Sequence, residues 1–120
     1  MKTAIQIDVE NNQVSTVQTE GEWTDEAINE QIDAVGGELA KNSIGGSGDI
    51  LVVGDFINHT TAGAACESNG FNLFGNTYYG DGLILGGERG ELEKPKTTVK
   101  EVAAAVEYVK RAGSGPMVEF

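Results

Sequence analysis

The densest group of residues that could do chemistry lies between Gly54 and Cys66, directly after a short apolar run. It holds an acid, an amide and two hydroxyls beside the only histidine (His59) and the only cysteine of the chain. A cysteine and a histidine can serve as nucleophile and base when a third group orients the imidazole. Asn58 or Asp55 could orient His59, but no catalytic motif surrounds either member of the pair. We therefore favour a buried cysteine and a hydrogen-bonded loop histidine, with no catalytic residue, over a small enzyme that uses His59 and Cys66.

A second group, further along the chain, combines flat aromatic faces with amide donors and acceptors. Such a set suits a nucleobase or the apolar anchors of a partner. Its members are Phe71, Asn72, Phe74, Asn76, Tyr78 and Tyr79. Core packing is the expectation for the two phenylalanines. The adjacent tyrosines must point to opposite sides of a strand, so one of them covers a surface or an interface.

Arginine is scarce, because Arg89 and Arg111 are the only two in the chain. The planar guanidinium binds phosphate or carboxylate through paired hydrogen bonds. Arg89 lies in a glycine-rich stretch, Gly86–Gly90, that no helix follows, so a wide turn is favoured over a phosphate-binding loop. Arg111, with Lys110, suits the negative end of a helix. The alternative is that Arg89, Lys110 and Arg111 together form one anion-binding site.

Metal chemistry is not expected. One histidine and one cysteine among scattered carboxylates do not supply the clustered ligands that zinc or iron requires. No cofactor is indicated either, because the glycine clusters lack the Gly-Lys-Ser/Thr ending of a nucleotide-triphosphate loop.

The first elements that would position these groups are a hairpin and a helix. Apolar residues alternate from Ile5 to Val9, Asn11–Asn12 supplies a turn, and residues 14–19 resume a strand pattern. Thr24 is a suitable helix N-cap, with Trp23 placed to pack on Ile28. An apolar stripe on this helix consists of Ile28, Ile32, Val35 and Leu39, and Gly36–Gly37 weakens the helix near its end.

The second half is expected to hold strands and a final helix. Ile50–Val53 is predicted to be a buried strand. Strand-like stretches at 71–74 and 77–79 are expected to turn tightly at Gly80–Asp81–Gly82 into a returning strand at 83–85. Thr98 and Glu101 form a capping box for a helix that Gly113 would stop, with an apolar face of small and β-branched residues.

These elements predict an α+β fold with a mainly antiparallel sheet and two helices, in the order β-β-α-β-β-β-α. We expect a single domain over residues 1–113 and a tail over residues 114–120, because 120 residues can bury one real core.

The charge balance limits the partners. Nineteen acidic residues against eight basic ones give a net charge of −11. This works against direct binding to nucleic acid and against a membrane surface. An acidic surface serves solubility, but it can also imitate a DNA backbone and dock on a basic protein. The start of the chain alternates polar and apolar residues instead of forming a signal peptide, so a cytoplasmic protein is expected.

The layout resembles small single-domain proteins encoded by phages, prophages and plasmids. The likeness rests on the strand from Met1 to Val9, the Asn11–Asn12 turn, the capped helix that ends Ala34–Val35–Gly36–Gly37, and the strand in Gly80–Gly86. Such proteins include acidic inhibitors of host nucleases and proteins that sequester the cyclic nucleotide signals of antiviral defence. The resemblance implies a host-takeover or anti-defence role in the host cytoplasm.

We therefore expect a non-catalytic binding protein that sequesters a small linear or cyclic nucleotide in a pocket at or near a subunit interface. Self-association is expected through the C-terminal helix. The expected ligand-binding residues are Phe56, Asn58, His59, Thr60, Asn76, Tyr78, Tyr79, Arg89 and Arg111. The aromatic rings would stack on the base, the amides would read its edge and the arginines would offset the phosphate. The main alternative is an acidic inhibitor or DNA mimic that binds a basic protein.

Overall fold

The fold is that of a computed structural model, which describes residues 1–32, 39–44, 48–54 and 69–109. Within these ranges the chain forms two helices and eight strands, and every strand pair is antiparallel. The elements are β1 (Lys2–Asp8), β2 (Gln13–Thr19), α1 (Asp25–Ile32), β3 (Leu39–Ile44), β4 (Asp49–Gly54), β5 (Gly70–Leu73), β6 (Asn76–Tyr79), β7 (Gly82–Leu85), α4 (Val99–Ala105) and β8 (Glu107–Val109). The expected α+β class with a mainly antiparallel sheet is confirmed.

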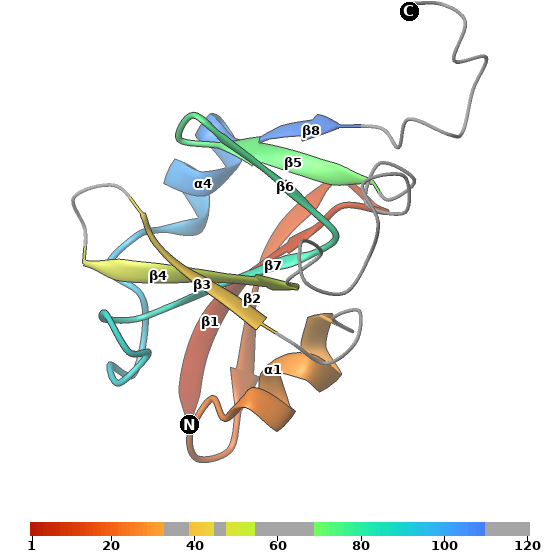
Figure 1. Cartoon of the computed structure of the whole chain (residues 1–120). Coiled ribbons are helices and arrows are strands. Elements are labelled where there is room, and N and C mark those ends of the chain that lie inside the picture. Colours follow the sequence, from red (N-terminus) through yellow and green to blue (C-terminus); the bar gives the residue numbers. More distant parts are fainter. Residues whose placement is uncertain (33–38, 45–47, 55–68, 110–120) are drawn as a thin grey trace, which may run out of the picture.

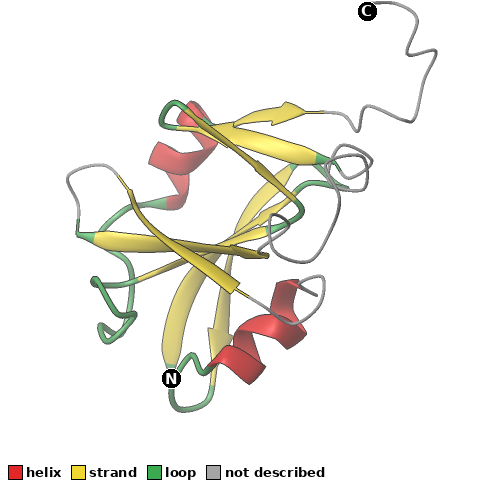
Figure 2. Cartoon of the chain, in the orientation of Figure 1, coloured by secondary structure: helices red, strands yellow, loops and turns green. Residues whose placement is uncertain are grey.

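The strands form a five-stranded sheet, in the order β2-β1-β7-β4-β3, and a three-stranded sheet, in the order β6-β5-β8. Figure 1 shows the larger sheet between α1 on one side and the smaller sheet with α4 on the other. Figure 2 shows how strands dominate the fold, with one helix at each end. The larger sheet is therefore the middle layer and is covered on both faces.

Two apolar clusters lie on the two faces of this sheet. One joins β1, β4 and β7 to Phe71, Leu73 and Val102, and the other joins the same strands to Ile28 and Ile32 of α1. Residues 50–53 and 83–85 of the central strands are buried throughout. Burial on both faces explains why these strands read as continuous apolar runs instead of alternating ones.

The N-terminal hairpin and the start of α1 agree with the sequence pattern. Asn12 takes a φ of 52° in the turn between β1 and β2, a conformation that asparagine tolerates better than most residues. The Thr24 hydroxyl accepts a hydrogen bond of 3.1 Å from the backbone N–H of Ala27, as an N-cap should. Trp23 packs against the same cluster as Ile28, which the expected staple requires.

The expectation that Leu39 lies on the helical stripe is wrong, because Leu39 is the first residue of β3. Val35 and Gly36–Gly37 lie outside the described residues. Strand β3 pairs with β4 from Leu39 opposite Gly54 to Ile44 opposite Asp49. It is an edge strand with a polar centre, so it lacks the apolar alternation by which a strand is recognised in sequence.

The tight turn expected at Gly80–Gly82 is also wrong, because β7 does not return alongside β6. Strand β7 instead crosses into the larger sheet and lies between β1 and β4. The strongly apolar β7 buries both its faces there, which an edge position in the smaller sheet would not allow.

The C-terminal helix is shorter than its pattern predicts. The capping box is present, because the Thr98 hydroxyl accepts from the Glu101 N–H and the Glu101 carboxylate accepts from the Thr98 N–H, both at 3.1 Å. The helix ends at Ala105, and Val106 is extended with a ψ of 140°. The residues that follow form β8 instead of a further helical turn, and Tyr108 lies opposite Phe71 of β5. Burial of Tyr108 against the apolar cluster favours the strand. Residues 110–120, with Gly113 and the expected tail, lie outside the described residues.

Candidate functional site

An open groove of about 430 Å³ runs between β3 and β6. These strands are the edges of the two sheets, so the groove lies where the larger sheet faces the smaller one along unpaired strands. Its lining is polar and comes from three consecutive residues on each strand: Lys41, Asn42, Ser43, Asn76, Thr77 and Tyr78. The residues that line the groove therefore come from two elements that are far apart in the chain.

Tyr78 is the anchored member of this lining. Its ring lies opposite Phe71 in the smaller sheet, with the ring centroids 5.3 Å apart and the planes tilted by 34°. Burial raises the pKa of the Tyr78 hydroxyl, against a hydrogen bond with the Asn76 side chain that lowers it. The phenol therefore stays protonated at neutral pH and can both donate and accept a hydrogen bond at the groove.

Lys41 is the only cationic residue among those that line the groove. Its ammonium lies 3.3 Å from the Asp25 carboxylate at the start of α1, and both side chains are exposed. An exposed ion pair of this kind contributes little to stability and exchanges readily with solvent ions. The Lys41 ammonium is therefore held only weakly by Asp25 and can exchange this carboxylate for another anion.

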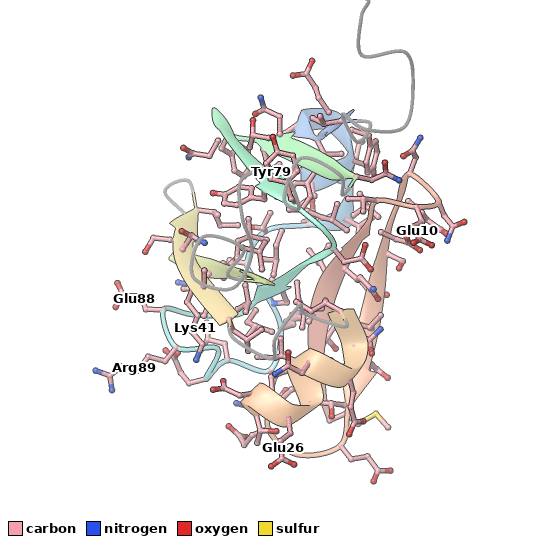
Figure 3. The ribbon with its side chains drawn as sticks, turned by 45° about the vertical axis from the view of Figure 1, so that its right-hand side comes forward. Glu10, Glu26, Lys41, Tyr79, Glu88 and Arg89 are labelled. Atoms are coloured by element: carbon pink, nitrogen blue, oxygen red, sulfur yellow. The ribbon has the colours of Figure 1, made fainter. Side chains whose placement is uncertain are left out.

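The structure brings two of the expected ligand-binding residues together, because Asn76 and Tyr78 both line the groove. Tyr79 lies on the opposite face of β6, across from Gly70, where a side chain on Gly70 would meet its ring. This confirms that the two tyrosines diverge. Figure 3 shows Tyr79 and Arg89 in different parts of the molecule. Arg89 therefore does not join the tyrosines in a shared site.

The other expected site residues lie outside the described part of the chain: Phe56, Asn58, His59, Thr60 and Arg111. Cys66 lies outside it as well, so the pairing of cysteine and histidine stays a prediction. The expectation that Phe74 packs in the core is wrong. Phe74 is 47% exposed in the turn between β5 and β6, whereas Phe71 is fully buried as expected.

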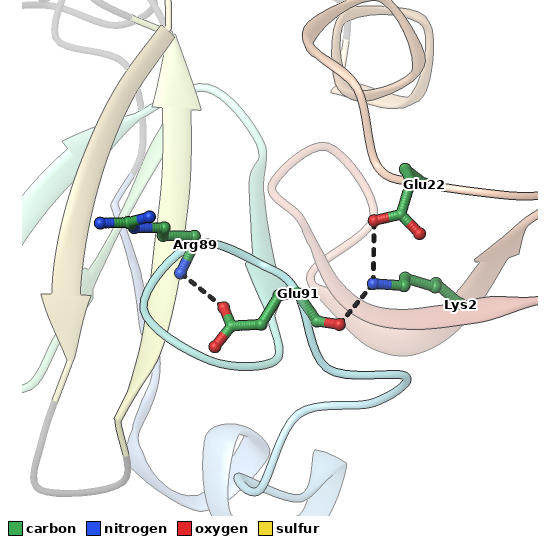
Figure 4. A network of polar contacts seen from close by, with 4 residues as sticks. All are labelled: Lys2, Glu22, Arg89 and Glu91. Carbon is green, nitrogen blue, oxygen red and sulfur yellow. Dashed lines mark hydrogen bonds and ion pairs between the residues drawn. The ribbon is translucent and has the colours of Figure 1, made fainter.

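The loop that holds Arg89 is filled by a carboxylate of its own chain. The Arg89 N–H donates to the Glu91 carboxylate at 2.9 Å, and that carboxylate lies against Gly87, where a Cβ would be 2.6 Å from it. Figure 4 shows this contact beside Lys2, which pairs with Glu22 and donates to the Glu91 carbonyl. The Glu91 side chain takes the place that an external anion would occupy, which supports the wide turn.

Two half-buried or buried carboxylates escaped the sequence pattern, and both organise the backbone. Asp49 is 1% exposed and accepts hydrogen bonds from the N–H groups of Gly87 and Lys96 at 3.2 Å, and from the backbone and hydroxyl of Thr97 at 2.8 and 2.7 Å. Burial opposes its charge, but these hydrogen bonds outweigh burial and lower the pKa of Asp49. Asp49 therefore ties the loop after β7 to the start of β4.

Asp81 is the contrasting case. It accepts from the Val9 N–H at 3.0 Å and from the Gln6 amide at 3.3 Å where the chain passes from β6 to β7. Burial, aided by the nearby charges of Asp8 and Glu10, raises the pKa of Asp81. Within the described residues no group of three or more potential ligands could hold a metal ion. The hydrogen bonds to Val9 and Gln6 tie the segment before β7 to the β1 region, which gives Asp81 a structural role.

Three comparisons bear on the identity of the chain, and none finds a match, whether with family models, with curated proteins or with solved structures. No helix in the described ranges has the length and apolar character needed to cross a membrane.

Proposed function

We propose that this is a non-catalytic binding protein whose β3–β6 groove holds a small anionic ligand of the nucleotide class. The observation that carries the proposal is one open groove whose lining includes Lys41 beside residues of β3 and β6 that bear amide and hydroxyl groups. Its volume of about 430 Å³ lies in the range of small-molecule sites. The polar lining suits a sugar and phosphate better than an apolar ligand.

The charge of the groove narrows the ligand class. One ammonium can offset one phosphodiester charge, whereas a triphosphate would bring several charges to a protein of net charge −11. Asn42 and Asn76 offer donors and acceptors to the edge of a base from opposite sides of the groove. Cyclic nucleotides, with one charge per phosphate, therefore fit better than linear di- or triphosphates. Sequestration of such a signal in a host cytoplasm is the role that the resemblance to phage proteins suggests.

Isothermal titration calorimetry with cyclic mono- and dinucleotides and their linear counterparts tests this function. Lys41→Gln should weaken binding about tenfold, since one charge-assisted hydrogen bond is lost. Lys100→Gln is the matched control, because it makes the same change of charge on an exposed helix residue outside the groove. The proposal fails if no nucleotide binds, or if both variants weaken binding equally.

A second candidate is an acidic inhibitor that docks on a basic protein. Only two ion pairs join described residues, so most of the described acidic side chains lack an ionic partner. Figure 3 shows Glu10, Glu26 and Glu88 on three sides of the molecule, which favours a diffuse field over one docking face. The salt dependence of binding distinguishes the two functions. Binding to a basic protein should weaken steeply with added NaCl, whereas binding of a singly charged ligand in the groove should weaken only slightly.

A further inference from the structure

Within the described residues no strand pairs with the outer edge of β2, and β2 carries no charged side chain. It lies at the end of the five-stranded sheet and pairs on one side with β1. None of the backbone hydrogen bonds between described residues outside the ladders involves residues 13–19. All seven residues of β2 are uncharged, although 22% of the chain is charged.

Open edges in monomeric proteins normally carry protection against pairing, in the form of charges, prolines or bulges. Strand β2 has none of these three: its residues are uncharged and pair with β1 without a bulge over the whole strand, although α4 packs against it. Threonine and valine make up four of its residues, and both favour extended structure. Figure 3 shows the β1–β2 hairpin along one margin of the molecule, with Glu10 near its tip.

The charge of the molecule indicates which partner this edge would accept. A basic protein is drawn to carboxylates, which this strand lacks. A second copy carries the same charge of −11, so two copies approach most easily along an uncharged strip. We propose that β2 pairs with β2 of a second copy, antiparallel about a two-fold axis near Thr16.

This register is self-complementary. Thr16 would lie opposite Thr16 of the second copy, and Gln13 opposite Thr19 of the second copy. Glu10 and Glu20 lie beyond the ends of β2, so no acidic side chain is directly opposite another within the paired residues. The two larger sheets would then form one continuous antiparallel sheet. The dimer is expected to be weak, because a strand pair buries less area than a standard interface.

Sedimentation velocity over a series of protein concentrations tests the proposal. The chain of 12.6 kDa should show a reversible monomer–dimer equilibrium. Dimerisation should strengthen with added NaCl, because salt screens the repulsion between two acidic copies. Thr16→Glu and Thr16→Lys should each weaken dimerisation at least about tenfold, because like charges then meet on the axis. A mixture of the two variants should restore a dimer, since opposite charges now face each other.

Two control variants locate the surface. Ser43→Lys places the same charge on the exposed edge strand at the other end of the sheet and should leave dimerisation unchanged. Ala104→Glu alters an exposed position on α4, the helix expected from sequence to mediate self-association, and should also leave it unchanged. The proposal is overturned by a monomer at all concentrations, by failure of the mixed variants to associate, or by loss of the dimer in either control.

Discussion

At the residue scale, the pKa values of Asp49 and Asp81 are shifted in opposite directions by the fold. The pKa of Asp49 is lowered from an ordinary value of 3.8, and the pKa of Asp81 is raised from the same value. A lowered pKa means that the folded state favours the carboxylate. Asp49 therefore stabilises the fold above pH 3.8, and this contribution is lost as the pH falls through its folded pKa. Asp81 costs stability at neutral pH, and acidification relieves that cost.

Asparagine at each position gives a matched pair of variants. Asp49→Asn should lower the free energy of unfolding at pH 7 by about 3 kcal/mol, because the new NH₂ faces N–H and O–H donors in a buried site. The loss should shrink as the pH falls below 3.8, where the wild type loses the same carboxylate. Asp81→Asn should cost far less at pH 7, since it removes an unfavourable charge. Urea denaturation at several pH values measures both, and an equal loss in the two variants would contradict the assignment.

At the scale of the element, the β5–β6 hairpin is built on an unsuitable turn residue. Phe74 and Gly75 connect the strands with φ values of 50° and 87°, as in a type I′ turn. Asparagine or glycine is preferred at the first of these positions, and a bulky side chain there costs about 1–2 kcal/mol. Phe74 recovers little of this cost by burial because it is 47% exposed.

Phe74→Asn should therefore raise the free energy of unfolding by about 1 kcal/mol and the melting temperature by about 4 °C or more. Asn12→Phe is the reciprocal control. Asn12 has nearly the same φ, 52°, in the turn between β1 and β2, and its replacement by phenylalanine should destabilise the protein to a similar extent. Thermal denaturation followed by circular dichroism measures both. A lower melting temperature for Phe74→Asn would mean that the exposed ring makes packing contacts that outweigh the strain.

The elements also show how far sequence reasoning reaches. The β1–β2 hairpin, the Thr24 and Thr98 caps, and the buried strand at 50–53 follow from local patterns, and all are confirmed. Strand β3 and strand β8 were missed because their stability comes from pairing with β4 and β5, which no local pattern encodes. The same holds for Asp49, whose partners Gly87 and Thr97 lie 38 and 48 residues further along the chain.

Only part of the groove lining could be predicted from the sequence, for the same reason. Asn76 and Tyr78 were expected to bind a ligand because amides beside aromatic residues are a local signal for ligand binding. Both line the groove, and their binding role stays a prediction. The other lining residues, Lys41, Asn42, Ser43 and Thr77, were not expected, and those of β3 line the groove only because the larger sheet lies beside β6. A groove between two sheet edges is a product of packing, so its second wall could not be derived from the sequence.

At the scale of the whole molecule, the net charge of −11 acts on stability as well as on partners. The described residues form only two ion pairs, Lys2 with Glu22 and Lys41 with Asp25. Attraction is thus local and weak, whereas repulsion among the remaining carboxylates is spread over the surface. Repulsion favours the expanded chain, and salt screens it within about 10 Å at 0.1 M.

The melting temperature should therefore rise with NaCl between about 10 mM and 0.5 M, where the Debye length falls from about 30 Å to a few ångströms. A gain of about 1 kcal/mol corresponds to about 4–8 °C for a domain of this size. The measurement belongs at low protein concentration, where the proposed dimerisation through β2 would add nothing to stability. A variant with Glu88→Gln and Glu107→Gln, both exposed positions, should start from a higher melting temperature and respond less to salt. A melting temperature that falls with salt would instead mean that the two ion pairs outweigh the repulsion, and the acidic surface would then carry no cost for folding.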